Sequence, residues 1–177
     1  MLHATLSVRF ASVVALLLLI APPAGAAVPD PVVAAAAELR ARVLTFNVWG
    51  VPNIAPDREG RMAVMAANIA KLEPHLVALQ EVWLPADAEL IGRGLAAVGL
   101  THQRYFGPSG ENKGSGLWVG SVFPIEEATF QRFGSGGVPY IPWHVDWMAH
   151  KGIAVVSVAT PVGSVRIANT HFQASYD

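Results

Sequence analysis

The hydrophobic positions of the chain follow two periodicities between residues 41 and 99. The runs ARVLTFNV (41–48) and LVALQEVW (76–83) are short, apolar and rich in β-branched and aromatic residues, which predicts two buried strands, the first of them central in its sheet. Between them apolar residues recur every three or four positions, which predicts an amphipathic helix over 58–72 that packs on the sheet. The apolar face of this helix comprises Met62, Met65, Ile69 and Leu72.

Capping and turn residues mark the ends of the predicted helices. Asp57 precedes the first helix and is a candidate N-cap. The segment LPADAELIGRGLAAVG (84–99) predicts a second helix, which Gly99 closes. The order strand, helix, strand, helix is typical of α/β layering.

Beyond residue 100 the pattern changes to short strands separated by Gly-rich turns. The predicted strands cover about 102–106, 115–122, 126–133, 152–160 and 163–171. Pro161 and Val162 separate the last two, which predicts a hairpin. We therefore expect one α/β domain over 41–177.

The N-terminal residues have the pattern of a secretory signal peptide over 1–26. An apolar run follows Arg9, and the small residues Ala24 and Ala26 form an Ala-x-Ala cleavage site. The alternative is an uncleaved anchor, but the run is shorter than the roughly 20 residues that span a bilayer. We expect cleavage after Ala26, a Pro/Ala-rich leader over 27–40 and a secreted protein.

Charge and cysteine content restrict the function classes. The chain has 12 basic and 13 acidic residues and no cysteine. Tight non-specific binding of nucleic acid requires clustered Lys and Arg, so a nucleic-acid partner is not indicated. Zinc–thiolate sites are excluded, and any metal must be held by oxygen and nitrogen ligands, which favours Mg²⁺, Mn²⁺ or Ca²⁺.

Three polar residues stand at the ends of apolar strands: Asn47, Glu81 and His171. Each has an ordinary explanation alone, as a turn former, a solvated loop residue and a structural histidine. Ligands of open α/β sheets bind at the carboxyl ends of strands, where loops present side chains to a shared crevice. Together the three predict a site in which a carboxylate and an amide hold a hard divalent cation and an imidazole meets a phosphate.

Four segments make a family resemblance specific. LTFNVWG, LVALQEVW, GSGLWVGSVFPI and ANTHFQA occur in the order and spacing of the endonuclease/exonuclease/phosphatase superfamily, and most closely resemble the neutral sphingomyelinases. The resemblance implies a DNase I-like four-layer α/β sandwich, of which 41–177 corresponds to the N-terminal half. It implies that Glu81 is the principal Mg²⁺ ligand, with Mn²⁺ as the alternative metal. Asn47 is implied at the metal and phosphate site, and His171 on the phosphate.

The sphingomyelinase branch rests on GVPYIPWHVDWMAHKGIAVV. Here the resemblance implies that Asp146 and Lys151 are catalytic-site residues; the alternative is a surface ion pair, which is worth about 0–1 kcal/mol. The activity implied is hydrolysis of sphingomyelin to ceramide and phosphocholine at a membrane surface.

Two further groups are candidates for substrate binding. The loop NKGSGLW, with Lys113, offers backbone N–H groups to a phosphate or is simply a hairpin turn. The aromatic residues Tyr140, Trp143 and Trp147 suit a lipid interface or cation–π recognition of choline, and alternatively form a small core under a loop.

The sequence also departs from the family. The later Asp-x-Asn motif and the Asp-His pair, which act on the attacking water, do not occur in the 177 residues. We therefore expect a domain truncated at its C-terminus, as a fragment or as a half-domain that pairs with another chain. The competing functions are a DNase-like nuclease, an inositol or sugar phosphatase, and a non-catalytic remnant.

Overall fold

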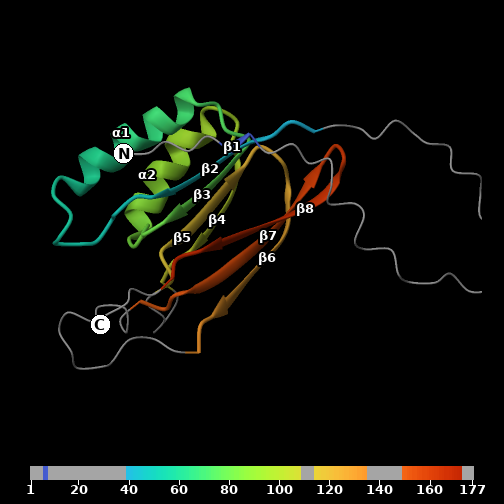
Figure 1. The fold of residues 1–177 in the computed structure, drawn as a ribbon. Coiled ribbons are helices and arrows are strands. Elements are labelled where there is room, and N and C mark those ends of the chain that lie inside the picture. The colour runs from blue at the N-terminus through green and yellow to red at the C-terminus, as the bar shows by residue number, and fades with distance from the viewer. Residues whose placement is uncertain (1–5, 8–38, 109–113, 135–148, 173–177) are drawn as a thin grey trace, which may run out of the picture.

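The computed structural model describes residues 6–7, 39–108, 114–134 and 149–172 (Figure 1). The elements follow one another as β1 (Leu6–Ser7), β2 (Arg42–Asn47), α1 (Arg58–Lys71), β3 (Leu76–Gln80), α2 (Pro85–Ala96), β4 (His102–Phe106), β5 (Leu117–Ser121), β6 (Ile125–Arg132), β7 (Gly152–Thr160) and β8 (Gly163–Thr170). The predicted order of helices and strands, and the β7–β8 hairpin, are confirmed.

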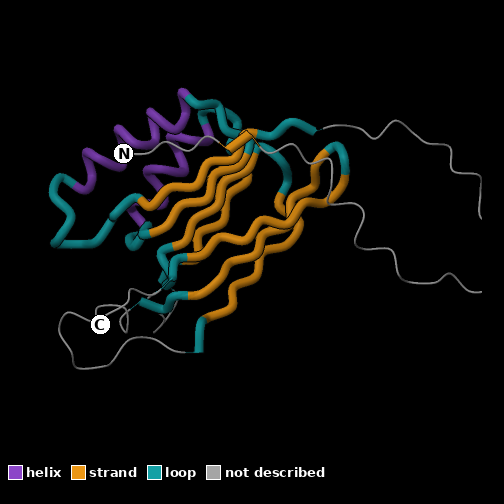
Figure 2. The backbone as a smooth tube through the Cα atoms, viewed as in Figure 1, coloured by secondary structure: helices purple, strands orange, loops and turns teal. Residues whose placement is uncertain are grey.

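The strands form two sheets. The larger has the order β1-β2-β3-β5-β4, in which β2 and β3 are parallel and the other pairs are antiparallel. The smaller is the antiparallel sheet β6-β7-β8. Both helices cover one face of the larger sheet, and the smaller sheet lies on its other face (Figures 1 and 2). The predicted α/β class is thus confirmed, as three layers within the described part of the chain.

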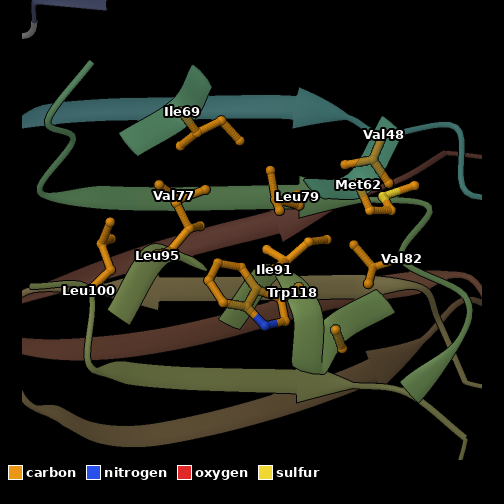
Figure 3. Close-up of a cluster of buried hydrophobic side chains, with 11 residues drawn as sticks. Val48, Met62, Ile69, Val77, Leu79, Val82, Ile91, Leu95, Leu100 and Trp118 are labelled. Carbon is orange, nitrogen blue, oxygen red and sulfur yellow. The ribbon is translucent and has the colours of Figure 1, made fainter. Parts of the chain in front are cut away.

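The main hydrophobic core lies between the helices and the larger sheet. Trp118 of β5 is fully buried there, in one cluster with side chains from both helices, and lies beside Ile91 and Leu95 of α2 (Figure 3). Val77 and Leu79 alternate along β3 and contribute to this core, as a period-two strand requires. Fully burying side chains of this size stabilises the fold by about 1.5–3 kcal/mol each.

A second, smaller core joins the two sheets. It contains Leu76 of β3, Val119 of β5, and Val156 and Val158 of β7, all buried. Because β3 contributes to both cores, four of its five residues are buried. The strand that ends at Glu81 is therefore fixed from both faces.

The predicted burial of β2 is wrong. Phe46 is 41% exposed and the burial pattern of the strand is mostly exposed. The reason is topological: β3 pairs with residues 43–47 of β2, whereas on the other side only the two residues of β1 pair with it in the described structure. An apolar run predicts a strand, but it does not report how many neighbours the strand has.

Two details of α1 also differ from the prediction. Leu72 lies beyond the last helical residue and is exposed, and Ala66 is buried with Met62 and Ile69 instead. Asp57 occupies the N-cap position with left-handed backbone angles, and its side chain makes no capping hydrogen bond. Gly99 has a φ of 95° just after α2, as predicted for a helix C-terminus.

The N-terminal predictions stay predictions. Apart from Leu6 and Ser7, which pair with Val43 and Arg42 of β2, and the last two leader residues 39 and 40, the predicted signal peptide and leader lie outside the described residues. Among the residues that are described, no helix has the length and apolarity needed to span a membrane.

A buried polar cluster connects the helices to β4. Arg58, at the start of α1, forms an ion pair with buried Asp87 in the first turn of α2. The buried hydroxyl of Tyr105 makes no hydrogen bond to the described residues. Burial, with a smaller contribution from the nearby Asp87 carboxylate, raises the pKa of Tyr105 from 10.0 to about 12.

This raised pKa predicts an alkaline loss of stability that Tyr105→Phe removes. Between pH 10 and 12 the tyrosine of the unfolded chain loses its proton before that of the folded chain, so the free energy of unfolding falls as pH rises. At pH 7 we expect Tyr105→Phe to be at least as stable as the original chain, because it removes a hydroxyl without a partner. Urea unfolding at pH 7 and pH 11 measures both effects. If the free energy of unfolding fell equally with pH in both proteins, the raised pKa of Tyr105 would be contradicted.

Candidate active site

The ends of three strands bring Asn47, Glu81 and His171 together. Asn47 is the last residue of β2, and in the parallel β2–β3 pair it lies opposite Gln80, directly before Glu81. The Asn47 side chain donates from Nδ2 to Glu81 Oε1 at 2.7 Å. His171 follows β8 of the other sheet, and its Nε2 lies 3.7 Å from the same Oε1. The structure thus places the three residues in one cluster, while their chemical roles stay predictions.

Glu81 is the electrostatic centre of this cluster. Its side chain is 14% exposed, and its Oε2 is buried without accepting a hydrogen bond from the described residues. A buried carboxylate oxygen without a partner costs free energy, which a bound cation would offset. The donor chemistry therefore fits a hard divalent ion at Glu81. Within the described part, however, no three His, Asp or Glu residues group into a metal site.

The structure gives Asn47 the geometry of an orienting group. Its Oδ1 accepts the backbone N–H of Trp49 at 2.8 Å, and its amide nitrogen faces Glu81. The bond from Trp49 holds the Asn47 side chain, and the bond from Asn47 in turn holds the carboxylate of Glu81. The amide oxygen keeps a second lone pair, which these bonds leave available to a metal ion. The predicted contact of Asn47 with a metal therefore stays a prediction.

The backbone around the site is tightly constrained. Trp49 and Glu81 both have positive φ, 48° and 62°, in the left-handed region that non-glycine residues seldom adopt. Val48 N–H donates to the Gln80 carbonyl at 3.0 Å and Gly50 N–H to the Glu81 carbonyl at 3.1 Å, so the two loops continue the strand pairing. A Cβ at Gly50 would overlap the Glu81 carbonyl oxygen, which explains why glycine is required there.

Arg61 of α1 is a residue that the sequence analysis missed. Its guanidinium donates to the carbonyls of Val48 at 3.0 Å and Trp49 at 3.4 Å, and lies 5.2 Å from the centre of the Trp49 ring. These contacts tie the helix to the loop that carries the site. An arginine one turn into a helix gives no sequence signal of such a contact.

Asn169 and Gln80 were also missed. Asn169 lies in β8 and is 2% exposed. It donates to the carbonyls of Leu79 at 3.0 Å and Trp118 at 3.2 Å, and accepts from Gln80 Nε2 at 2.7 Å. Asn169 lies within the ANTHFQA motif, so its presence was visible, but its burial against the other sheet was not.

Lys151 is buried, and its predicted partner Asp146 lies outside the described residues. Lys151 Nζ donates to the carbonyl of Phe172 at 2.9 Å, directly after His171. The structure therefore places this predicted residue beside the cluster. The remaining predicted residues lie outside the described part of the chain: Lys113, Tyr140, Trp143, Asp146 and Trp147.

Exposed aromatic side chains flank the cluster. Trp49 is 47% exposed and Phe172 is 71% exposed. Each is close in sequence to a cluster residue, and Phe172 stacks on Phe133 with ring centres 6.0 Å apart. Exposed apolar side chains therefore stand close to two of the cluster residues along the chain.

The chain is similar in sequence to proteins named as sphingolipid phosphodiesterases. Over 139 residues the chain is 35% identical to a putative neutral sphingomyelinase of Drosophila melanogaster. The aligned residues make up 78% of this chain and 31% of that protein. The chain is 36% identical over 136 residues to an inositol phosphosphingolipids phospholipase C of Schizosaccharomyces pombe, covering 76% of this chain and 31% of that protein. The chain spans about a third of the length of these relatives.

Solved structures share the fold. Sphingomyelinase C from Streptomyces griseocarneus superimposes with a TM-score of 0.62 at 22% identity, covering 77% of this chain and 50% of that chain. A beta toxin variant from Staphylococcus aureus, with bound magnesium ions, gives a TM-score of 0.62 at 15% identity over 76% and 50% of the two chains. The model of the Endonuclease/Exonuclease/phosphatase family matches residues 44–177. The chain therefore belongs to the Endonuclease/Exonuclease/phosphatase family.

Proposed function

We propose that the chain contributes the cation and phosphate site of a sphingomyelinase-type phosphodiesterase, which hydrolyses sphingomyelin to ceramide and phosphocholine. The observation that carries the proposal is the convergence of Asn47, Glu81 and His171, with a buried Glu81 oxygen that accepts no hydrogen bond from the described residues. The relatives named for sphingomyelin and inositol phosphosphingolipid hydrolysis support the substrate class.

Glu81 would hold the metal ion, with Mg²⁺ as the proposed cofactor and Mn²⁺ as the alternative. Magnesium in the Staphylococcus aureus beta toxin supports this choice. Bound beside a phosphodiester, such an ion neutralises charge on the phosphoryl oxygens. Asn47 would keep the carboxylate in place through its 2.7 Å hydrogen bond.

His171 would act on the phosphate directly. Its Nε2 lies 3.7 Å from Glu81 Oε1, so a phosphoryl oxygen next to Glu81 would come within reach of the imidazole. A hydrogen bond from Nε2 to that oxygen would stabilise the charge that develops in the transition state. The buried ammonium of Lys151, held on the Phe172 carbonyl, would add positive charge at the same end of β8.

Activation of the attacking water requires a base. The resemblance assigns it to the Asp-x-Asn and Asp-His motifs, which do not occur in these 177 residues. Turnover by this chain alone is therefore not part of the proposal, whereas binding of cation and phosphate is.

The proposed partner is a phospholipid at a membrane surface, reached after export through residues 1–26. Exposed Trp49 and Phe172 support this, because aromatic rings beside the site suit the headgroup region of a bilayer. The balance of 12 basic and 13 acidic residues gives no support to a nucleic-acid partner.

One second candidate has an observation in its favour. The 36% identical fission-yeast relative is named for inositol phosphosphingolipids. Inositol phosphate is therefore the competing headgroup, and the same cation site would serve both esters.

Substrate assays test the proposal. The full chain is incubated with Mg²⁺ and mixed micelles of sphingomyelin, with micelles of an inositol phosphosphingolipid, and with plasmid DNA. We expect binding of the lipid micelles that changes little with salt, because the nearly equal numbers of basic and acidic residues do not favour binding through clustered positive charge. Equilibrium binding of the micelles is the deciding readout, and any release of phosphocholine is recorded beside it. Salt-sensitive binding to DNA, with none to either lipid, would overturn the proposal.

Glu81→Gln tests the metal ligand. The change keeps the shape and the hydrogen bond from Asn47 but removes the charge, so we expect the Mg²⁺ dissociation constant to rise at least ~10-fold. Isothermal titration calorimetry measures it. Glu89→Gln, an exposed position on α2, is the matched control. Equal Mg²⁺ affinity of both variants would remove Glu81 as the ligand.

Gly50→Ala tests the backbone constraint beside Glu81. The added methyl overlaps the Glu81 carbonyl oxygen, and overpacking of this kind costs about 1–3 kcal/mol of unfolding free energy. We expect weaker Mg²⁺ binding as well, because the strand end carrying Glu81 must move. The control is Gly134→Ala, where a Cβ meets nothing within 4 Å. Urea unfolding and calorimetry together measure the result, and two variants of equal stability would refute the constraint.

A further inference from the structure

Asn169 occupies an unusual position for an amide side chain. It is the one buried residue of β8, where an apolar residue would ordinarily pack against the other sheet. Burial of an amide costs free energy unless its hydrogen bonds are made. Here the amide makes three, two as donor and one as acceptor.

These bonds cross between the two sheets. The donor side reaches the backbone carbonyls of Leu79 in β3 and Trp118 in β5, at 3.0 and 3.2 Å. The acceptor side receives Gln80 Nε2 at 2.7 Å, and the same nitrogen also lies 3.1 Å from Thr45 Oγ1 of β2. One side chain of the smaller sheet is therefore bound to β3 and β5, and through Gln80 to β2.

Much of the remaining side-chain contact between the sheets is of a different kind, although the backbone N–H of His150, before β7, also donates to the carbonyl of Gly114, before β5, at 3.2 Å. Leu76, Val119, Val156 and Val158 form an apolar cluster, and hydrophobic contact is non-directional. Such a cluster holds the sheets together but tolerates a small displacement of one over the other. Hydrogen bonds weaken steeply when distance and angle change, so the bonds of Asn169 fix the offset between the sheets.

The bridge lies next to the candidate site on both sides. Gln80 directly precedes Glu81, and Asn169 lies two residues before His171. Glu81 belongs to the larger sheet and His171 to the smaller. The 3.7 Å separation of Glu81 Oε1 and His171 Nε2 therefore depends on the offset between the sheets.

The geometry points to the Gln80–Asn169 bridge as a positioning element that sets the spacing between Glu81 and His171. This inference rests on the proposed function for its catalytic consequence, but its geometric content is independent of it. Neither residue touches the reacting atoms. Their effect is to hold the carboxylate and the imidazole at the separation that a phosphate beside a cation requires.

Two variants of the full chain test the bridge. Asn169→Ala removes all three bonds, and Gln80→Met removes the bond from Gln80 at a half-buried position where folding is not at risk. Val158→Ala is the control, since Val158 is buried between the sheets and pairs with Val165, away from the end of β8 that carries His171.

The first readout is the separation of Glu81 Oε1 and His171 Nε2 in crystal structures of the original chain and the variants. We expect it to lengthen by about 1 Å in both bridge variants, a displacement that costs roughly 100-fold in catalysis. In Val158→Ala it should not change. An unchanged separation in Gln80→Met and Asn169→Ala would overturn the inference.

The second readout separates positioning from stability. If the original chain releases phosphocholine, we expect kcat of the bridge variants to fall about 10- to 100-fold while KM and the Mg²⁺ dissociation constant change less than about threefold, because Asn47 still holds Glu81. A loss of thermal stability with unchanged kcat would overturn the positioning role. If the original chain binds neither Mg²⁺ nor lipid, the proposed function fails, and the separation alone then decides for or against the bridge.

Discussion

Burial of β3 on both faces is the constraint on which the rest of the structure depends. Val77 and Leu79 pack toward the helices, and Leu76 packs toward the smaller sheet. Parallel pairing with β2 then brings Asn47 to the same sheet edge, and the position of Glu81 follows from the end of the strand. A side chain at the end of so fixed a strand is held to a precision that an exposed loop does not give.

Periodicity and turn residues predicted the helices and strands because these depend on local pattern. The cluster of Asn47, Glu81 and His171 was predictable for a related reason, since each residue ends an apolar run. The exposure of Phe46 was not predictable, because it depends on which strands neighbour β2. Leu72 likewise fits the helical period but lies just past the last helical residue.

The residues that support the site were hidden from the sequence for a physical reason. Arg61 donates to backbone carbonyls, and Asn169 donates to two more, so no complementary side chain marks these partners in the sequence. Gln80, the side-chain partner of Asn169, is 89 positions away and gives no local signal. Glycine at position 50 is explained only by the nearby carbonyl of Glu81. The sequence therefore reveals candidate site residues, which have distinctive side chains, more readily than the residues that hold them in position.

The wide separation of the site residues along the chain has a consequence for the order of folding. Asn47 and Glu81 are 34 positions apart, and the intervening helix allows β2 and β3 to pair early. Gln80 and Asn169 are 89 positions apart, a contact that carries a larger loop-closure cost and forms late. We therefore expect the Asn47–Glu81 half of the site to form first, and the site to close only when the smaller sheet docks and brings His171 to it.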